Sequence, residues 1–342
     1  MKNVLRTLGA LFLLVTAIPA IAEDTDMVSL TSGNKLTGRI LELARGRLTF
    51  RITGAGTVDI NVTNIETLSS DRMFDVELPS GEWLSGSIAG SAAGTLSIRN
   101  ASGAPQTVPM KDVIRMTGVG ANLRERTSGD LELGFDYGSV DHAIDWTFSG
   151  DMRNRTRNYL NEISLDSLLR RESGDTTQRR TDLALASRRF FPGRWFLMGR
   201  LEGADDKDLG LDSRYLAAAA GGKTLLQSSR TTLSAYAGID YVLEDYSGVP
   251  GNDSSAEALA ALEWDWFEPG GDTELETRTT VYRSFDRSRW RAEATASLRR
   301  DIFRNFYWSV NLFESYDSDP PLGLERSDFG LTFAVGLSLG RL

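Results

Sequence analysis

The end of the chain, from Phe329 to Gly340, alternates between large apolar residues and small or polar ones. A period of two predicts a β-strand, because successive side chains point to opposite faces of a sheet. A soluble sandwich would place charged residues opposite the apolar face, whereas a membrane barrel places small and polar groups there, towards an enclosed lumen. The pattern therefore predicts one lipid-facing and one lumen-facing set of side chains. The first set contains Leu331, Phe333 and Val335, and the second contains Thr332, Ala334 and Gly336.

Similar alternation begins at Gly129 and predicts twelve antiparallel strands. Their expected spans are 129–138, 142–153, 157–170, 178–191, 194–204, 214–227, 230–245, 256–267, 273–285, 289–301, 305–316 and 327–341. An even number of strands returns the C-terminus to the side on which the barrel begins, the periplasmic side in bacterial outer-membrane barrels. The expected fold class is therefore all-β, with a twelve-stranded outer-membrane barrel over residues 129–342.

The connections and the aromatic residues divide between the two ends of these strands. Short turns are expected at 191–194, 268–272 and Arg304, and longer acidic loops at 172–177, 205–213, 246–255 and 317–326. The end with the short turns carries Phe191, Trp195, Trp266, Phe303, Phe306 and Trp308. The end with the longer loops carries Tyr137, Tyr215, Tyr241, Phe285, Trp290, Tyr316 and Phe329. Two aromatic girdles are typical of a membrane barrel. The alternative is a soluble β-sandwich whose aromatics fall near strand ends by chance.

Upstream of the barrel the chain repeats itself at an offset of 48 residues. Corresponding positions are Ser32-Gly33 and Ser80-Gly81, Gly38 and Gly86, Ile40 and Ile88, Gly46-Arg47-Leu48 and Gly94-Thr95-Leu96, Phe50 and Ile98, Ile60 and Val108, and Leu68 and Met116. This pattern predicts a strand, then a turn that contains glycine, then a second strand. A unit of this length buries little by itself, so two small bent sheets packed together are expected, each similar in pattern to a five-stranded Sm-like or SH3-like barrel.

The expected domains are therefore repeats at 23–70 and 71–118, a polar linker at 119–128, and the barrel. Small barrels of this kind serve as spacers or plugs, or bind partners such as the cell wall or another envelope protein. Both interpretations stay open for residues 23–118. Trp83 follows the second glycine turn and is expected to pack on its own sheet.

The first 22 residues have the pattern of a secretory signal peptide. Lys2 and Arg6 precede an apolar run from Leu8 to Ile18, and Ala20-Ile21-Ala22 offers a cleavage site before Glu23. The apolar run is too short to span a bilayer as a helix. An uncleaved anchor is the less favoured alternative.

Composition excludes several kinds of chemistry. The net charge of −9, which loss of Lys2 and Arg6 would make more negative, argues against a nucleic-acid partner. The chain has no cysteine, and its only histidine, His142, falls in a turn near Ser139 without a sequence pattern for a catalytic triad. An outer-membrane hydrolase is therefore the least favoured function, and no cofactor or metal site is expected. Acidic loops at 205–208, 252–253 and 317–319 lack the spacing of a calcium loop.

Charged residues share the expected lumen face of three successive strands. These are Glu257, Glu263, Asp265, Glu274, Glu276, Arg278, Arg289, Arg291, Glu293 and Arg299. A hairpin folded about Arg287 would place Glu276 opposite Arg299, with Asp265 beside the two glutamates. One interpretation is a self-neutralising lattice that braces the wall. The other is that surplus carboxylates make a water-filled pore prefer cations.

The tail also resembles a known family. The hairpin Tyr316-Asp317-Ser318-Asp319-Pro320-Pro321, then Gly323, Arg326-Ser327-Asp328 and the closing strand, is similar to the YdiY-like "salt-induced outer membrane protein" family, domain of unknown function 481. The resemblance covers about 129–342 and implies an outer-membrane barrel without a known activity. One departure is the end Arg341-Leu342, because such barrels usually end in an aromatic residue that the assembly machinery recognises.

Two functions follow from these observations. The first is a narrow channel for ions or small solutes, which the family name would link to osmotic or salt stress. The second is a closed barrel that anchors the repeat domain to the outer membrane. Strand number does not separate them, because eight-stranded barrels are filled by side chains and sixteen-stranded ones hold water. The expected partners are outer-membrane lipid and lipopolysaccharide, the barrel assembly machinery, and a periplasmic or cell-wall partner for residues 23–118.

Overall fold

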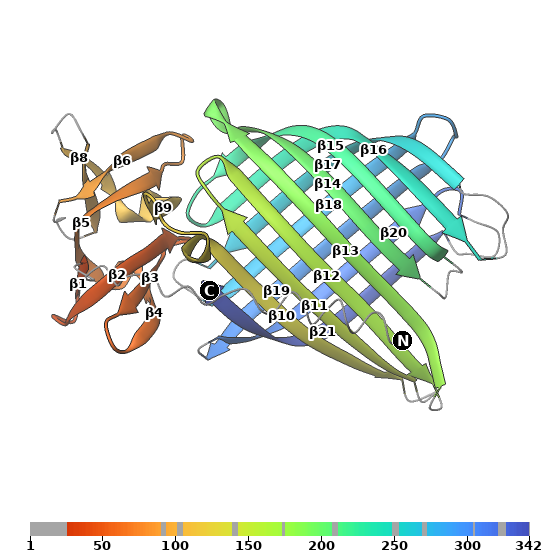
Figure 1. Cartoon of the computed structure of the whole chain (residues 1–342), viewed down its shortest axis with the longest axis horizontal. Coiled ribbons are helices and arrows are strands. Elements are labelled where there is room, and N and C mark those ends of the chain that lie inside the picture. The colour runs from red at the N-terminus through yellow and green to blue at the C-terminus, as the bar shows by residue number, and fades with distance from the viewer. Residues whose placement is uncertain are drawn as a thin grey trace.

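The computed structural model contains two all-β units, a small N-terminal domain and a large barrel (Figure 1). It describes residues 26–89, 94–100, 105–138, 143–172, 175–206, 211–247, 253–268, 272–303, 305–320 and 326–341. The expected signal peptide lies outside this range, as do His142 and Ser139. Within the described residues, no helix is long and apolar enough to cross a membrane.

Twelve antiparallel strands close into a barrel, β10 pairing with β21 (Figure 1). Their bounds are β10 Thr127–Gly138, β11 Ala143–Arg155, β12 Tyr159–Glu172, β13 Asp175–Phe191, β14 Trp195–Asp206, β15 Leu211–Gln227, β16 Thr231–Tyr246, β17 Asp253–Phe267, β18 Thr273–Ser284, β19 Trp290–Phe303, β20 Phe306–Asp317 and β21 Ser327–Arg341. The predicted all-β class and strand number are confirmed. The expected loop at 172–177 is shorter than predicted, because Arg171 pairs with Thr176 and Glu172 with Asp175.

The side chains of the barrel strands alternate between an apolar exterior and a polar interior. On β21, 62% of Phe333 is exposed, whereas the next residue, Ala334, is only 7% exposed. Leu331 and Val335 are exposed on the same side as Phe333. This confirms the two faces predicted for the closing strand. The barrel thus has the apolar outer surface that a lipid environment requires.

Exposed aromatic side chains lie near both ends of the barrel exterior. Phe191, Trp195, Phe303 and Phe306 are exposed at one end, and Tyr215, Tyr241, Phe285, Trp290, Tyr316 and Phe329 at the other. We call the first end proximal, because the N-terminal domain lies against it, and the other distal (Figure 1). This distribution matches the aromatic girdles of membrane barrels.

The N-terminal domain is one continuous nine-stranded sheet around one core. Its strands are β1 Asp26–Leu30, β2 Lys35–Ala44, β3 Arg47–Ile52, β4 Gly56–Asn61, β5 Ile65–Glu77, β6 Trp83–Ile88, β7 Thr95–Arg99, β8 Pro105–Pro109 and β9 Arg115–Gly118. Short 3-10 turns, η1 Val62–Asn64, η2 Met110–Asp112 and η3 Arg124–Arg126, complete it. The expectation of two separate sheets is wrong, because β5 belongs to both repeats and β9 pairs with β2 as well as β5.

The repeat itself is visible in the backbone pairing. In the first copy β1 pairs with β5 through Met27 and Ser69, and in the second β5 pairs with β9 through Asp75 and Thr117. Gly38 and Gly86 occupy equivalent places, where a Cβ atom would lie only 2.0 Å and 2.3 Å from the carbonyl oxygens of Arg51 and Arg99. Only glycine permits this close approach of two strands. The core contains both members of each matched apolar pair, for example Phe50 and Ile98.

Candidate functional site

The candidate functional site is the interior of the barrel and its proximal mouth. Strand register places the charged residues of β17, β18 and β19 on one face. Glu263 is opposite Arg278, Asp265 opposite Glu276, and Glu274 opposite Arg299. Because Glu263 also meets Arg188 of the non-neighbouring strand β13 at 2.9 Å, this face is the inward one.

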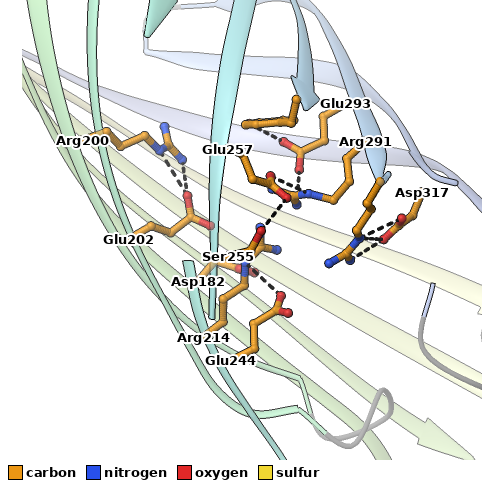
Figure 2. A network of polar contacts seen from close by, with 12 residues as sticks. Asp182, Arg200, Glu202, Arg214, Glu244, Ser255, Glu257, Arg291, Glu293 and Asp317 are labelled. Carbon is orange, nitrogen blue, oxygen red and sulfur yellow. Dashed lines mark hydrogen bonds and ion pairs between the residues drawn. The ribbon is translucent and has the colours of Figure 1, made fainter. Parts of the chain in front are cut away.

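The distal part of the interior contains a network of arginine–carboxylate pairs (Figure 2). Arg291 donates to Glu257 at 2.6 Å, and Glu257 is only 1% exposed. Arg200 donates to Glu202 at 2.7 Å, and Arg289 to Asp317 at 2.5 Å. Planar guanidinium groups suit such bonds because they present several donors in a fixed geometry. This half of the lumen is braced by the predicted kind of self-neutralising lattice.

Asp240 is the exception in this distal region. The residue is 3% exposed, and neither carboxylate oxygen has a hydrogen-bond partner within the described residues. Its neighbour across the strand pair is Glu257, another carboxylate. A buried carboxylate is costly unless a proton, a cation or a donor satisfies it. A proton or a cation held at Asp240 would satisfy this carboxylate.

In the proximal half, ion pairs cross the lumen. Arg153 on β11 donates through both terminal nitrogens to Glu276 on β18, each at 3.3 Å, although the two strands lie on nearly opposite sides of the closed barrel. Arg188 on β13 reaches Glu263 on β17, which Arg278 also contacts at 3.0 Å. We call these five residues the cross-lumen bridges. They narrow the lumen near its proximal mouth.

One wall of the lumen keeps carboxylates in contact with solvent. Asp151 on β11 and Asp166 on β12 have the inward parity of Arg153 and Glu162, which form an ion pair, yet both are exposed. In the described part of the chain neither of them forms an ion pair. Their register partners are Ser164 and Ser149, so they lie diagonally beside each other. The β11–β12 wall thus borders an accessible space that the bridges do not fill.

The N-terminal domain adds two arginines to the proximal mouth. Arg45, in the turn between β2 and β3, forms an ion pair with Glu274 and lies 3.9 Å from Glu276. Its guanidinium carbon is 3.8 Å from the centroid of the Phe267 ring. Arg47 reaches Asp272 at 3.2 Å and Asp301 at 3.3 Å. The carboxylates of the mouth are thus partly neutralised by another domain.

Further contacts fix the domain against the proximal turns. Gln227 donates to Glu77 at 2.9 Å, and Ser229 donates to the backbone oxygen of Lys111 at 2.6 Å. The guanidinium of Arg157, in the β11–β12 turn, is 5.6 Å from the ring of Trp83. The interpretation that Trp83 packs only on its own sheet is therefore incomplete, because one face of its ring meets the barrel.

The ten charged residues expected in the lumen divide among these groups. Glu257, Arg289, Arg291 and Glu293 belong to the distal network, and Glu263, Asp265, Glu274, Glu276, Arg278 and Arg299 to the proximal half. The predicted pairing of Glu276 with Arg299 is wrong. Glu276 lies opposite Ser297, because the hairpin is centred between Asp286 and Arg287. Arg299 instead bonds to Asp130 at 2.8 Å and Asp301 at 3.2 Å.

Sequence reasoning missed the arginines that supply most of these partners. The signal that could have found Arg153 and Arg188 is their alternation with exterior residues on their own strands. Gly46-Arg47-Leu48 matches Gly94-Thr95-Leu96 in the repeat, but nothing local shows that this segment, with Arg45 before it, meets the barrel. Of the acidic loops, Asp317 is engaged by Arg289. Within the described residues, no group of three or more suitable side chains is arranged to hold a metal ion.

Comparison with solved structures finds other membrane barrels at low identity. The NanC porin is 10% identical, with 62% of this chain and 100% of the porin covered and a TM-score of 0.42. The translocator domain of autotransporter NalP from Neisseria meningitidis is 11% identical (63% and 87% covered, TM-score 0.37). The KdgM porin in complex with disordered oligogalacturonate is 9% identical (62% and 97% covered, TM-score 0.33). Similarity at this level transfers neither activity nor ligand.

Comparison with curated protein sequences gives no match. A family model described as "Protein of unknown function, DUF481" matches residues 133–339, well over half of the chain and nearly all of the barrel. This confirms the resemblance that the Asp317-Ser318-Asp319 hairpin and the closing strand suggested. The chain belongs to the DUF481 family.

Proposed function

We propose that the protein is an outer-membrane barrel that passes ions or small solutes through a narrow, cation-preferring lumen. The N-terminal domain would lie in the periplasm, on the side to which an even number of strands returns the chain. The exterior supports the membrane location, because Leu133, Leu201 and Phe333 expose large apolar side chains along the middle of their strands. No enzymatic activity is part of this proposal.

The observation that carries the proposal is the pair of exposed inward carboxylates, Asp151 and Asp166. Among the described residues, the exposed arginines on the inward face are held by partners: Arg180 bonds to Asp182 at 2.7 Å, and Arg278 to Glu263. Charges that face a low-dielectric barrel wall are costly unless they are paired or wetted. Asp151 and Asp166 have no such ion pairs, so they are the wetted ones. Unpaired carboxylates along a narrow aqueous path favour cations.

The experiment is a reversal-potential measurement on the purified protein in planar bilayers under a salt gradient. Asp151→Asn combined with Asp166→Asn should move the reversal potential towards the anion side. The control is Glu66→Gln combined with Asp71→Asn, which removes the same charge from exposed positions of the N-terminal domain. An equal shift in both variants would mean that the two lumen carboxylates do not set selectivity.

A second function is favoured by the cross-lumen bridges. A barrel closed by Arg153–Glu276 and by the docked domain would act as an anchor that holds the domain at the membrane. The absence of current from the parent protein and from variants without the bridges would support this anchor. In either function the N-terminal domain would meet a periplasmic or cell-wall partner. The proposed partners of the barrel are lipid, lipopolysaccharide and the assembly machinery. A link to osmotic or salt stress is likewise a proposal.

A further inference from the structure

The turn between β2 and β3 places an arginine in an unusual backbone conformation. Arg45 and Gly46 form a two-residue hairpin turn with φ values of 55° and 73°. Positive φ at both central positions is the mark of a type I′ turn, whose first position favours asparagine, aspartate or glycine. Arginine is not selected by the turn itself. Its position is explained instead by what its side chain reaches.

The guanidinium of Arg45 occupies a cation site that belongs to the barrel. Glu274 and Glu276 approach it from β18, and the face of the Phe267 ring lies beneath it at 3.8 Å. Carboxylates beside an aromatic face are the usual surroundings for a planar organic cation. We call Phe267, Glu274 and Glu276 the mouth site. Arg47 anchors the same hairpin to the rim through Asp272 and Asp301.

The internal repeat provides a comparison within the same chain. At the offset of 48 residues, Arg45 corresponds to Ala93 and Arg47 to Thr95. The matching turn glycines, Gly46 and Gly94, are kept, with φ values of 73° and 72°. The fold of the repeat therefore needs the glycine and not the arginines. The two cations occur only in the copy whose hairpin lies at the barrel mouth.

We propose that the β2–β3 hairpin is a tethered plug, in which Arg45 occupies a mouth site that accepts guanidinium-type cations. When the hairpin withdraws, the site and the path behind it become free for cationic solutes. The proposal rests on the proposed pore function and deepens it, because it assigns a solute class and a gate. Several of the docking contacts are ion pairs that are partly exposed to solvent, and because such pairs contribute little stability each, they do not prevent the hairpin from withdrawing.

The first test compares currents through full-length variants. Arg45→Ala combined with Arg47→Ala should give a several-fold rise in mean current. Arg99→Ala, which removes a cation from the exposed end of β7, should leave the current unchanged. The converse variant carries Lys111→Cys and Ser229→Cys, at a contact that joins the domain to the β15–β16 turn. The chain has no native cysteine, so this disulfide is the only one that can form within it. Its formation under oxidising conditions should suppress the current, and reduction should restore the current.

The second test probes the emptied site with the guanidinium ion. In the variant that lacks Arg45 and Arg47, added guanidinium should reduce the sodium current, and ammonium at equal concentration should reduce it much less. Adding Glu274→Gln and Glu276→Gln to the variant should abolish this difference. Equal currents in the oxidised and reduced cysteine variant, or no guanidinium block, would overturn the plug while leaving the pore. No current from any variant would overturn both the plug and the proposed pore.

Discussion

At the scale of single residues, adjacent positions on β21 are expected to respond very differently to charge. Phe333 points outward and Thr332 inward, opposite Asn311. Arginine on the lipid face near the bilayer midplane costs roughly 2–4 kcal/mol, whereas a polar lumen tolerates it. Phe333→Arg should therefore impair folding far more than Thr332→Arg, as measured by heat-modifiable gel mobility. Equal damage from both would contradict the assignment of the two faces.

Gly336 is expected to be intolerant of even a methyl group. A Cβ atom there would lie 2.1 Å from the Tyr307 ring, and Tyr307 is only 1% exposed. Overpacking of this kind costs on the order of 1–3 kcal/mol. Gly336→Ala should lower the denaturant midpoint of the barrel, and in a Tyr307→Ala background, where the ring is absent, the same change should lower it much less. The control, Gly221→Ala, meets its nearest neighbour, Leu197, at an ordinary 3.5 Å. A loss of stability in Gly221→Ala as large as in Gly336→Ala would argue against a specific clash with the ring.

The facing of residues could be predicted from sequence, but their partners could not. Alternation alone places Glu263 and Glu276 inside, because side-chain direction depends only on parity along a strand. Partner choice depends on register and on strands far away in sequence. A register change of two residues is enough to exchange Arg299 for Ser297 opposite Glu276. Nothing local in the sequence indicates that Arg153, on β11, is the partner of Glu276.

At the scale of elements, β5 is expected to couple the two repeats. It runs from Ile65 to Glu77, pairs with β1 in the first copy and β6 in the second, and buries Phe74 in the common core. Phe→Ala changes in a packed core typically cost about 3–5 kcal/mol. Phe74→Ala should therefore increase hydrogen exchange in both repeats together. Increased exchange confined to β6–β9 would contradict a single folding unit.

The order of strand, glycine turn and strand in the N-terminal domain followed from the 48-residue pattern, whereas the way in which the strands assemble did not. Matched glycine turns such as those at Gly33 and Gly81 depend on local residues and can be recognised in the sequence. The pairing of β9 with β2, through Met116 and Leu43, joins strands from different copies. Two independent sheets would have the same local pattern, so only long-range packing decides between them. The contact of Arg45 with the mouth is beyond sequence reasoning for the same reason.

At the scale of the whole molecule, the mature chain is expected to begin at Glu23 and to fractionate with the outer membrane. The reasons are the signal pattern before Glu23 and the apolar exterior of the barrel, because a surface of that kind is stable only against lipid. Intact-mass measurement on outer-membrane fractions checks both expectations. A product that retains Lys2 to Ala22, or one found in the soluble periplasm, would contradict them.

The central claim is that the barrel conducts cations along the wall that carries Asp151 and Asp166. The most direct measurement is the current through the purified full-length protein in a planar bilayer separating two concentrations of sodium chloride. The account predicts small discrete currents whose reversal potential lies towards the Nernst potential of sodium. The absence of any current, or a reversal potential at the Nernst potential of chloride, would contradict it.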